Sequence, residues 1–245
     1  MNLTNFTNQI AIITGGTGAL GRVIVNKFAE AGMKIYVPVR SISEFNKIFD
    51  DSQQEGEFKG LLKRYCLPCD ATNENEVKEF CSNVVKQEKR IDYLINTIGG
   101  YHPKRIILDT DTELIESQLK LNFYTTFYFT KHALTHMQAN NFGRVVSIGA
   151  KPALETTAGK FAYSFSKGGV VNLMQTLAEE FKEQDIAFNA IIPSIIDTPA
   201  NRQSMPNSDF TKWVSPVDIA ETCLFLISDR AKSVRGNVVK MYGRV

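Results

Sequence analysis

The stretch TGGTGALG, residues 14–21, decides the fold of this chain of 245 residues. The apolar run Ile10–Ile13 comes before it, and an amphipathic pattern over Gly21–Ala31 follows it directly. A glycine-rich turn between a strand and a helix lets backbone N–H groups approach a pyrophosphate at the positive end of the helix. The flanking strand and helix favour such a binding site over a simple tight turn.

The rest of the chain alternates between two periodicities. Short runs rich in Ile and Val are typical of strands that are buried on both faces of a parallel sheet. They are Ile10–Ile13, Ile35–Val39, Tyr93–Ile95, Val145–Ile148, Ile186–Ile192 and Val238–Tyr242. Stretches with helical spacing lie between them, at Gly21–Ala31, Glu74–Lys89, Glu113–Met137, Tyr163–Phe181 and Val217–Ile227. This order predicts an α/β fold, a doubly wound parallel sheet of about seven strands with helices on both faces.

Composition and charge argue against a disordered, a membrane-spanning and a nucleic-acid-binding protein. Apolar residues make up 43% and charged residues 22% of the chain, with a formal net charge of +2, as in a globular protein. We expect one domain over residues 1–245, in the cytoplasm, without nucleic-acid or membrane partners. Cys66 and Cys69 have metal-like spacing, and His132 and His136 lie one helical turn apart. Neither pair has further ligands in the sequence, so we expect no metal site.

The end of the second strand bears on the choice of cofactor. In a dinucleotide-binding fold, a carboxylate at this point holds the ribose 2′-hydroxyl of NAD, whereas an arginine accommodates the 2′-phosphate of NADP. Here Val39 is followed by Arg40. The sequence therefore favours NADP(H), with NAD(H) as the alternative.

The remaining motifs resemble those of the short-chain dehydrogenase/reductase family, classical type, over nearly the whole chain. The family's cofactor motif TGxxx(A/G)xG corresponds to residues 14–21, and DYLINTIG at residues 92–99 resembles DxLVNNAG. YSFSK at residues 163–167 is the YxxxK motif, and PSIIDT at residues 193–198 resembles PGxIxT. The chain departs from the family pattern at Thr97, Ile98 and Ser194. The resemblance implies a Rossmann-type NAD(P)H-dependent oxidoreductase that acts on a small-molecule substrate.

The resemblance also implies roles for particular residues. Tyr163, Lys167 and Asn122 would be catalytic, with Asn122 in a water-linked proton relay. Residues that would bind the cofactor are Gly15, Thr17, Gly18, Ala19, Leu20, Gly21, Arg40, Asp70, Ala71, Asn96, Gly99, Tyr163, Lys167, Pro193, Ile196 and Thr198. Asp70 and Ala71 would hold the adenine, and residues 193–198 would hold the nicotinamide carboxamide. A substrate lid is expected at about residues 198–213.

Tyr163 and Lys167 also suggest a mechanism by themselves. At positions i and i+4 the two side chains share one face of a helix. A free phenol has a pKa near ~10, and a neighbouring ammonium together with an oxidised nicotinamide ring would lower it. Tyr163 is therefore predicted to be the general acid for an oxygen or nitrogen beside the carbon that receives hydride.

One position of the family pattern is altered. The serine that polarises a substrate carbonyl stands thirteen residues before the tyrosine, and Ala150 occupies that place here. Ser147 is three residues earlier on a strand, so its side chain is expected on the opposite face. Thr156 and Thr157 are candidate substitutes. If neither threonine replaces the serine, the substrate is not an ordinary ketone.

Quinonoid dihydropteridine reductases also lack this serine. Gly149–Leu154 and Asp197–Phe210, followed by Trp213, resemble their sequences, whereas Asn96, Asn122 and Arg40 fit the broader family better. We therefore expect a reductase of this branch or a near relative. A carbonyl or 3-oxoacyl reductase is the first alternative, and a non-catalytic NADP(H)-binding sensor or scaffold is the second. The aromatic residues around Phe123–Phe129 suggest a homodimer or homotetramer, although deep burial within one subunit explains them nearly as well.

Overall fold

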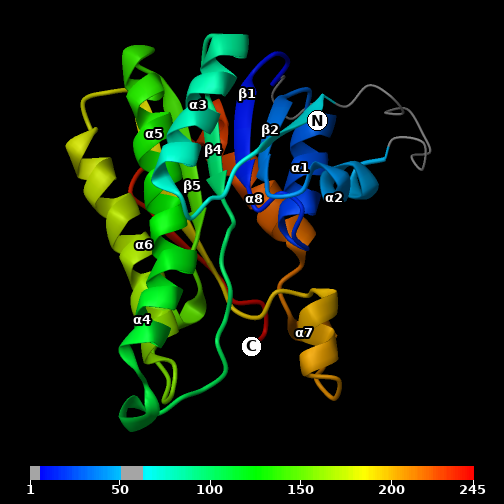
Figure 1. Cartoon of the computed structure of the whole chain (residues 1–245), viewed down its shortest axis with the longest axis vertical. Coiled ribbons are helices and arrows are strands. Elements are labelled where there is room, and N and C mark those ends of the chain that lie inside the picture. Colours follow the sequence, from blue (N-terminus) through cyan, green and yellow to red (C-terminus); the bar gives the residue numbers. More distant parts are fainter. Residues whose placement is uncertain (1–5, 51–62) are drawn as a thin grey trace.

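A computed structural model describes residues 6–50 and 63–245 of the chain. A parallel sheet lies at its centre, between the helices (Figure 1). The sheet has seven strands in the order β3-β2-β1-β4-β5-β6-β7. The strands are β1 (Ile10–Thr14), β2 (Lys34–Val39), β3 (Arg64–Pro68), β4 (Tyr93–Asn96), β5 (Gly143–Ile148), β6 (Ile186–Pro193) and β7 (Val238–Met241). The predicted doubly wound parallel sheet is confirmed.

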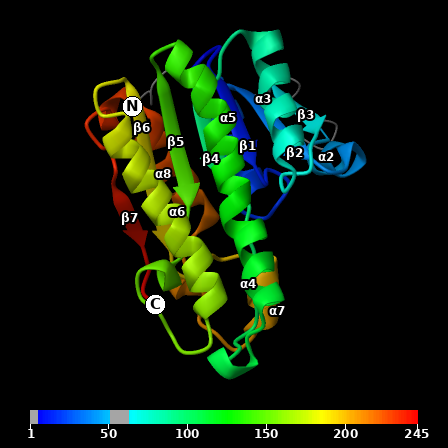
Figure 2. The same cartoon turned by 60° about the vertical axis from the view of Figure 1, so that its left-hand side comes forward.

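Helices cover both faces of this sheet (Figure 2). On one face lie α3 (Glu74–Glu88), α5 (Thr125–Ala139) and α6 (Phe161–Glu180), with α4 (Thr112–Leu119) against the end of α6. On the other face lie α1 (Gly21–Glu30) and α8 (Pro216–Ile227), which pack on each other. The short α2 (Ile42–Ile48) follows β2, and α7 (Pro199–Ser204) follows β6.

Two hydrophobic cores explain why the strand sequences are apolar on consecutive residues. In β1, Ala11 and Ile13 pack into the core under α1 and α8, whereas Ile10 and Ile12 pack into the core under α3, α5 and α6. All four side chains are at most 1% exposed. A strand whose two faces are both covered by helices needs apolar residues at every position, as the sequence has here.

The strand order places a crevice between β1 and β4. The chain winds outward from β1 to β3 on one side and from β4 to β7 on the other, so the connections leave β1 and β4 in opposite directions. Ligands of open α/β sheets bind at such a reversal, beyond the carboxyl ends of the strands. Thr97 fixes the end of β4 next to the end of β1, since its hydroxyl donates to Thr14 O at 2.6 Å.

The helix predicted over Glu113–Met137 contains a π-helical turn at Lys120–Tyr124, between α4 and α5. Single π turns inside helices are frequent at functional sites. The sequence prediction also missed α2, which is capped by Ser41 and buries only Phe45. Phe123 stacks on Phe127 and Tyr124 on Tyr128, and the subunit interface inferred from these aromatic residues stays a prediction.

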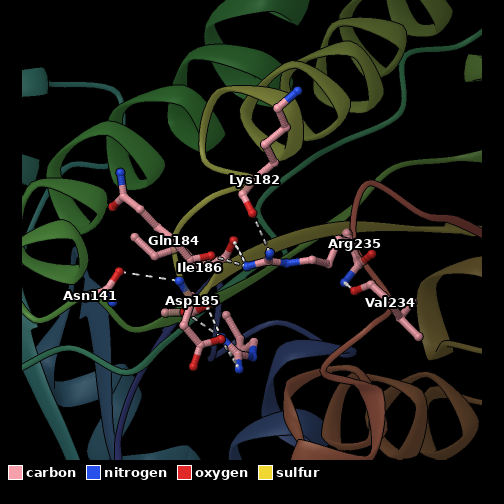
Figure 3. A network of polar contacts seen from close by, with 10 residues as sticks. Asn141, Lys182, Gln184, Asp185, Ile186, Val234 and Arg235 are labelled. Atoms are coloured by element: carbon pink, nitrogen blue, oxygen red, sulfur yellow. Dashed lines mark hydrogen bonds and ion pairs between the residues drawn. The ribbon is translucent and has the colours of Figure 1, made fainter.

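At the opposite end of the sheet, Arg235 fixes the start of β6 (Figure 3). Its guanidinium donates to Lys182 O and Ile186 O, both at 3.0 Å, and to Gln184 O. Asp185 in the same turn pairs with the buried Arg144 at 2.7 Å. The strand that carries residues 193–198 to the crevice is therefore anchored far from the crevice.

Over residues 6–50 and 63–245, no helix has both the length and the apolar character needed to cross a bilayer.

Candidate active site

The glycine turn after β1 brings the main chain very close to the start of α1. Gly15 has a φ of +66°, and the N–H of Gly18 donates to Gly15 O at 2.9 Å. A Cβ placed on Gly21 would lie 2.1 Å from Gly15 O, so no other residue fits there without a shift of the backbone. Ala19 and Leu20 are partly buried, and Leu20 packs on the core under α1. The turn is therefore a narrow shelf of main chain in front of a helix N-terminus.

A groove of about 240 Å³ runs from this turn across the ends of β2 and β3. Gly15, Thr17, Arg40, Asp70 and Ala71 line it, together with residues of the π turn and α5. The sequence therefore predicted five residues that the fold brings together. Thr72 donates both its N–H and its hydroxyl to Asp70 Oδ1 at 2.9 Å, and these bonds lower the pKa of the Asp70 carboxyl.

The π turn directs Asn122 toward the middle of the crevice. Asn122 is fully buried; its Oδ1 accepts the N–H of Gly100 at 2.9 Å, and its Nδ2 donates to Gly100 O and Gln118 Oε1. A Cβ on Gly99 would lie 2.8 Å from Asn122 Oδ1 and 2.7 Å from Lys167 Nζ. Gly99 is thus the point at which Asn122 and Lys167 approach the same patch of main chain.

Lys167 is buried, with 3% of its surface exposed. Its ammonium donates to Ile148 O at 3.0 Å, at the end of β5. Burial lowers the pKa of Lys167 to about 8. Over the described residues this carbonyl is its one hydrogen-bond acceptor, so two of its three N–H donors are left for a bound molecule. A dinucleotide extending from the glycine shelf would satisfy such a buried cation, and the residues present fit that cofactor.

Tyr163 lies one helical turn before Lys167 on α6 and forms part of the wall of a cavity of about 530 Å³. Burial, with a smaller contribution from Tyr101, raises the pKa of the Tyr163 phenol to about 12. In the protein by itself Lys167 does not lower this pKa, and the lowering expected with an oxidised nicotinamide bound stays a prediction. The ammonium is held by Ile148 O beneath the strand end, and the desolvation of the phenol dominates.

Ala150 lines the same cavity as Tyr163, as its position in the sequence predicts. Ser147 is fully buried and accepts a hydrogen bond from Asn96 Nδ2 at 3.1 Å, so its hydroxyl does not face the cavity. Of the two threonines considered as substitutes, Thr157 lines the cavity and Thr156 does not. The serine of the family pattern is missing, and among the residues that the structure describes Thr157 is the one threonine that lines the cavity beside Tyr163.

The side chain of Asn96 is turned away from the groove. It is 2% exposed and donates to Thr130 Oγ1 and Ser147 Oγ, both at 3.1 Å. Its amide nitrogen therefore joins β4, β5 and α5, and a contact of Asn96 with the cofactor stays a prediction.

The predicted lid consists of α7 and a 3₁₀ turn at Phe210–Lys212. Thr198 caps α7 by accepting the N–H of Asn201 at 3.3 Å, and Asn201 Nδ2 donates to Ile196 O at 2.8 Å. Pro193 ends β6, and the following Ser194 lines the large cavity together with Asn201. Residues 193–198 thus form a bend between the sheet and the lid.

Sequence reasoning missed several cavity residues. Tyr101, Lys104 and Lys160 line it, and the ring of Tyr101 packs edge-on against the ring of Tyr163 at a centroid distance of 5.3 Å. Tyr101 and Lys104 lie in the loop after β4 and Lys160 lies just before α6, and neither segment has a periodicity from which to predict their positions.

Comparison with known proteins shows which class this fold and site define. The sequence profile of the short chain dehydrogenase family matches residues 9–209. The chain therefore belongs to the short-chain dehydrogenase family of NAD(P)-dependent oxidoreductases. It is 28% identical to the uncharacterized oxidoreductase YxjF of Bacillus subtilis, an alignment that covers 96% of this chain and 97% of that protein.

Two further relatives agree with this assignment. The 7alpha-hydroxysteroid dehydrogenase of Paraclostridium sordellii is 26% identical, with 98% of this chain and 93% of the relative aligned. A short-chain type dehydrogenase/reductase from Mycobacterium ulcerans has the same fold, with a TM-score of 0.90 over 98% of this chain and 90% of that chain, at 24% identity.

Proposed function

We propose that this protein is an NADP(H)-dependent reductase that transfers a hydride to a small molecule, with Tyr163 as the proton donor. The observation that carries the proposal is the place of Tyr163. Tyr163 lines the 530 Å³ cavity, one helical turn from the buried ammonium of Lys167.

The chain's own residues would divide the work. The glycine shelf, Arg40, Asp70 and Ala71 would bind the dinucleotide, and Lys167 would hold its ribose through its two spare N–H donors. When bound, the reduced nicotinamide supplies the hydride. A pKa well above neutrality keeps the Tyr163 phenol protonated, as a general acid must be, and the phenol gives its proton to the oxygen or nitrogen next to the reduced carbon. Asn122 fixes Gly99 and Gly100 next to this point.

Arg40 supports the preference for NADP(H). It is exposed at the rim of the groove and forms no hydrogen bond or ion pair among the residues of the described ranges, so its guanidinium is available for a phosphate. Glu44 lines the same groove, and its carboxylate would favour a 2′-hydroxyl instead. The arginine directly follows β2, the usual place of the residue that reads the 2′ position.

For the substrate we favour an electron-deficient ring of the quinonoid dihydropterin type. Ala150 leaves no serine to polarise a carbonyl, and such a ring accepts a hydride and a proton without that group. The second candidate is a ketone or the corresponding secondary alcohol. The hydroxysteroid dehydrogenase relative and the hydroxyl of Thr157 in the cavity favour it.

The test follows NADPH oxidation by its near-ultraviolet absorbance with quinonoid dihydropterin, ketones, 3-oxoacyl thioesters and quinones. We expect turnover with at least one of these classes, and the class with the largest kcat/KM decides between the two candidates. NADPH binding without turnover of any compound would contradict the proposal and favour a non-catalytic sensor or scaffold.

The cofactor preference is tested with Arg40→Ser. Loss of the guanidinium should raise the KM for NADPH by about tenfold or more, because a charge-assisted contact to phosphate contributes roughly 1.5–3 kcal/mol. The KM for NADH should stay nearly unchanged. Equal effects on the two cofactors would show that Arg40 does not read the 2′-phosphate.

A further inference from the structure

We propose that the cavity beside Tyr163 binds a substrate that carries an anionic group, and that Lys104 and Lys160 recognise this group. The inference rests on the proposed function, because it concerns the substrate of the same site. It adds the chemical class: a small molecule with a reducible centre and a carboxylate or phosphate.

The charges around the cavity are unequal. Three lysines line it, Lys104, Lys151 and Lys160, against one carboxylate side chain, Glu155. Lys151 is already matched, since its ammonium lies 3.8 Å from Glu155 Oε2 and donates to Val245 O at 3.3 Å. Glu155 is also shared with Lys240 at 3.9 Å. Lys104 and Lys160 are therefore the two lysines of the cavity whose positive charge is not neutralised by Glu155.

The main chain holds these two lysines close together. The N–H of Arg105 donates to Gly159 O at 2.9 Å, which joins the loop after β4 to the segment before α6. The contact is tight: Gly159 has a φ of +76°, and a Cβ on it would lie 3.2 Å from Lys104 Cβ. Lys104 and Lys160 each stand next to a residue of this contact.

Neither of the two ammonium groups has an ion-pair partner in the described ranges 6–50 and 63–245. The neighbouring Arg105 does have one, Asp111, at 3.3 Å. Lys160 instead lies over the ring of Tyr101, 5.4 Å from its centroid. Both side chains line the cavity, so an anionic group bound there would meet positive charge that no carboxylate neutralises.

The position of this positive pair suggests where the anionic group lies relative to the reacting atom. The ring of Tyr101 contacts both the ammonium of Lys160 and the ring of Tyr163. One aromatic ring therefore links the cation to the proton donor. A substrate with a carboxylate or phosphate a few bonds from its reducible centre fits this spacing.

Kinetics with matched probes test the inference. The probes are quinonoid 6-carboxydihydropterin against quinonoid 6-methyldihydropterin, 3-oxobutanoate and 4-oxopentanoate against their methyl esters, and dihydroxyacetone phosphate against dihydroxyacetone, which also separates carboxylate from phosphate. In a double variant with Lys104→Met and Lys160→Met, the KM for the preferred anion should rise about tenfold or more. The kinetic constants for its neutral counterpart should not change. Lys78→Met, on the exposed side of α3, is the control and should match the wild type.

Binding separates this inference from the proposed function. Calorimetric titration of each probe into the protein loaded with NADP⁺ should show an anion that binds about tenfold more tightly than its neutral counterpart, and a preference that disappears in the double variant. Lysine-dependent anion binding without turnover would contradict the proposed function and support the inference. Equal binding of anion and neutral probe, or no binding of any anion, would overturn the inference whether or not ketones are reduced.

Discussion

Tyr163→Phe should lower kcat by about 10²–10⁴-fold, the usual contribution of a positioned general acid. The substitution removes only the hydroxyl and keeps the ring, so the edge-on packing with Tyr101 should survive. The KM for NADPH should change little, because the groove beside Arg40 and Asp70 is untouched. The measurement is the steady-state rate of NADPH oxidation with the best compound of the substrate panel.

A matched control separates chemistry from packing. Tyr128 lies on α5, stacks on Tyr124 and lines neither the groove nor the large cavity. Tyr128→Phe should therefore keep the wild-type kcat. If Tyr163→Phe retained full turnover, another group would have to supply the proton, and the assignment of Tyr163 would be wrong.

Gly21→Ala should weaken cofactor binding and destabilise the fold. The added Cβ would lie 2.1 Å from Gly15 O, so the glycine shelf or the start of α1 must move. We expect a free energy of unfolding lower by about 1–3 kcal/mol, as for other overpacked sites. The affinity for NADPH should fall by more than about tenfold, because the backbone N–H groups would no longer line up with the pyrophosphate.

Gly18→Ala in the same turn provides the comparison. Gly18 is exposed, and a Cβ on it would lie 3.2 Å from Gly15 O, so a small adjustment is enough. Its loss of NADPH affinity, measured by fluorescence titration, should be much smaller than that of Gly21→Ala. Equal and full binding by both variants would show that the turn is not the pyrophosphate site.

The sequence predicted the parts of this structure whose signals are local or periodic. The runs of β1, β5 and β6 are apolar on consecutive residues because both of their faces are buried. The glycine shelf was predicted from a sequence motif. The structure shows why this motif requires glycine at residue 21, where a Cβ would clash with Gly15 O. Ala150 and Tyr163 line the same cavity, as their spacing of thirteen residues predicts. Ala150 follows the end of β5, and Tyr163 lies on α6.

Other features depend on contacts between distant segments and could not be predicted in this way. The π turn that orients Asn122 has the same hydrophobic pattern as an ordinary helix. Asn96 was assigned to the cofactor, yet Thr130 and Ser147 draw its side chain inward. The raised pKa of Tyr163 in the protein by itself could not be predicted, because burial, which raises it, cannot be read from a spacing of four residues. The approach of Lys104 to Lys160 requires the contact between Arg105 and Gly159.

The most direct test of the account is a crystal structure of the chain with NADP⁺ bound. We predict the pyrophosphate on the glycine shelf, the 2′-phosphate at Arg40, and the nicotinamide ring between Lys167 and the cavity that Tyr163 and Ala150 line. A cofactor bound elsewhere, or a Tyr163 hydroxyl directed away from the nicotinamide, would contradict it.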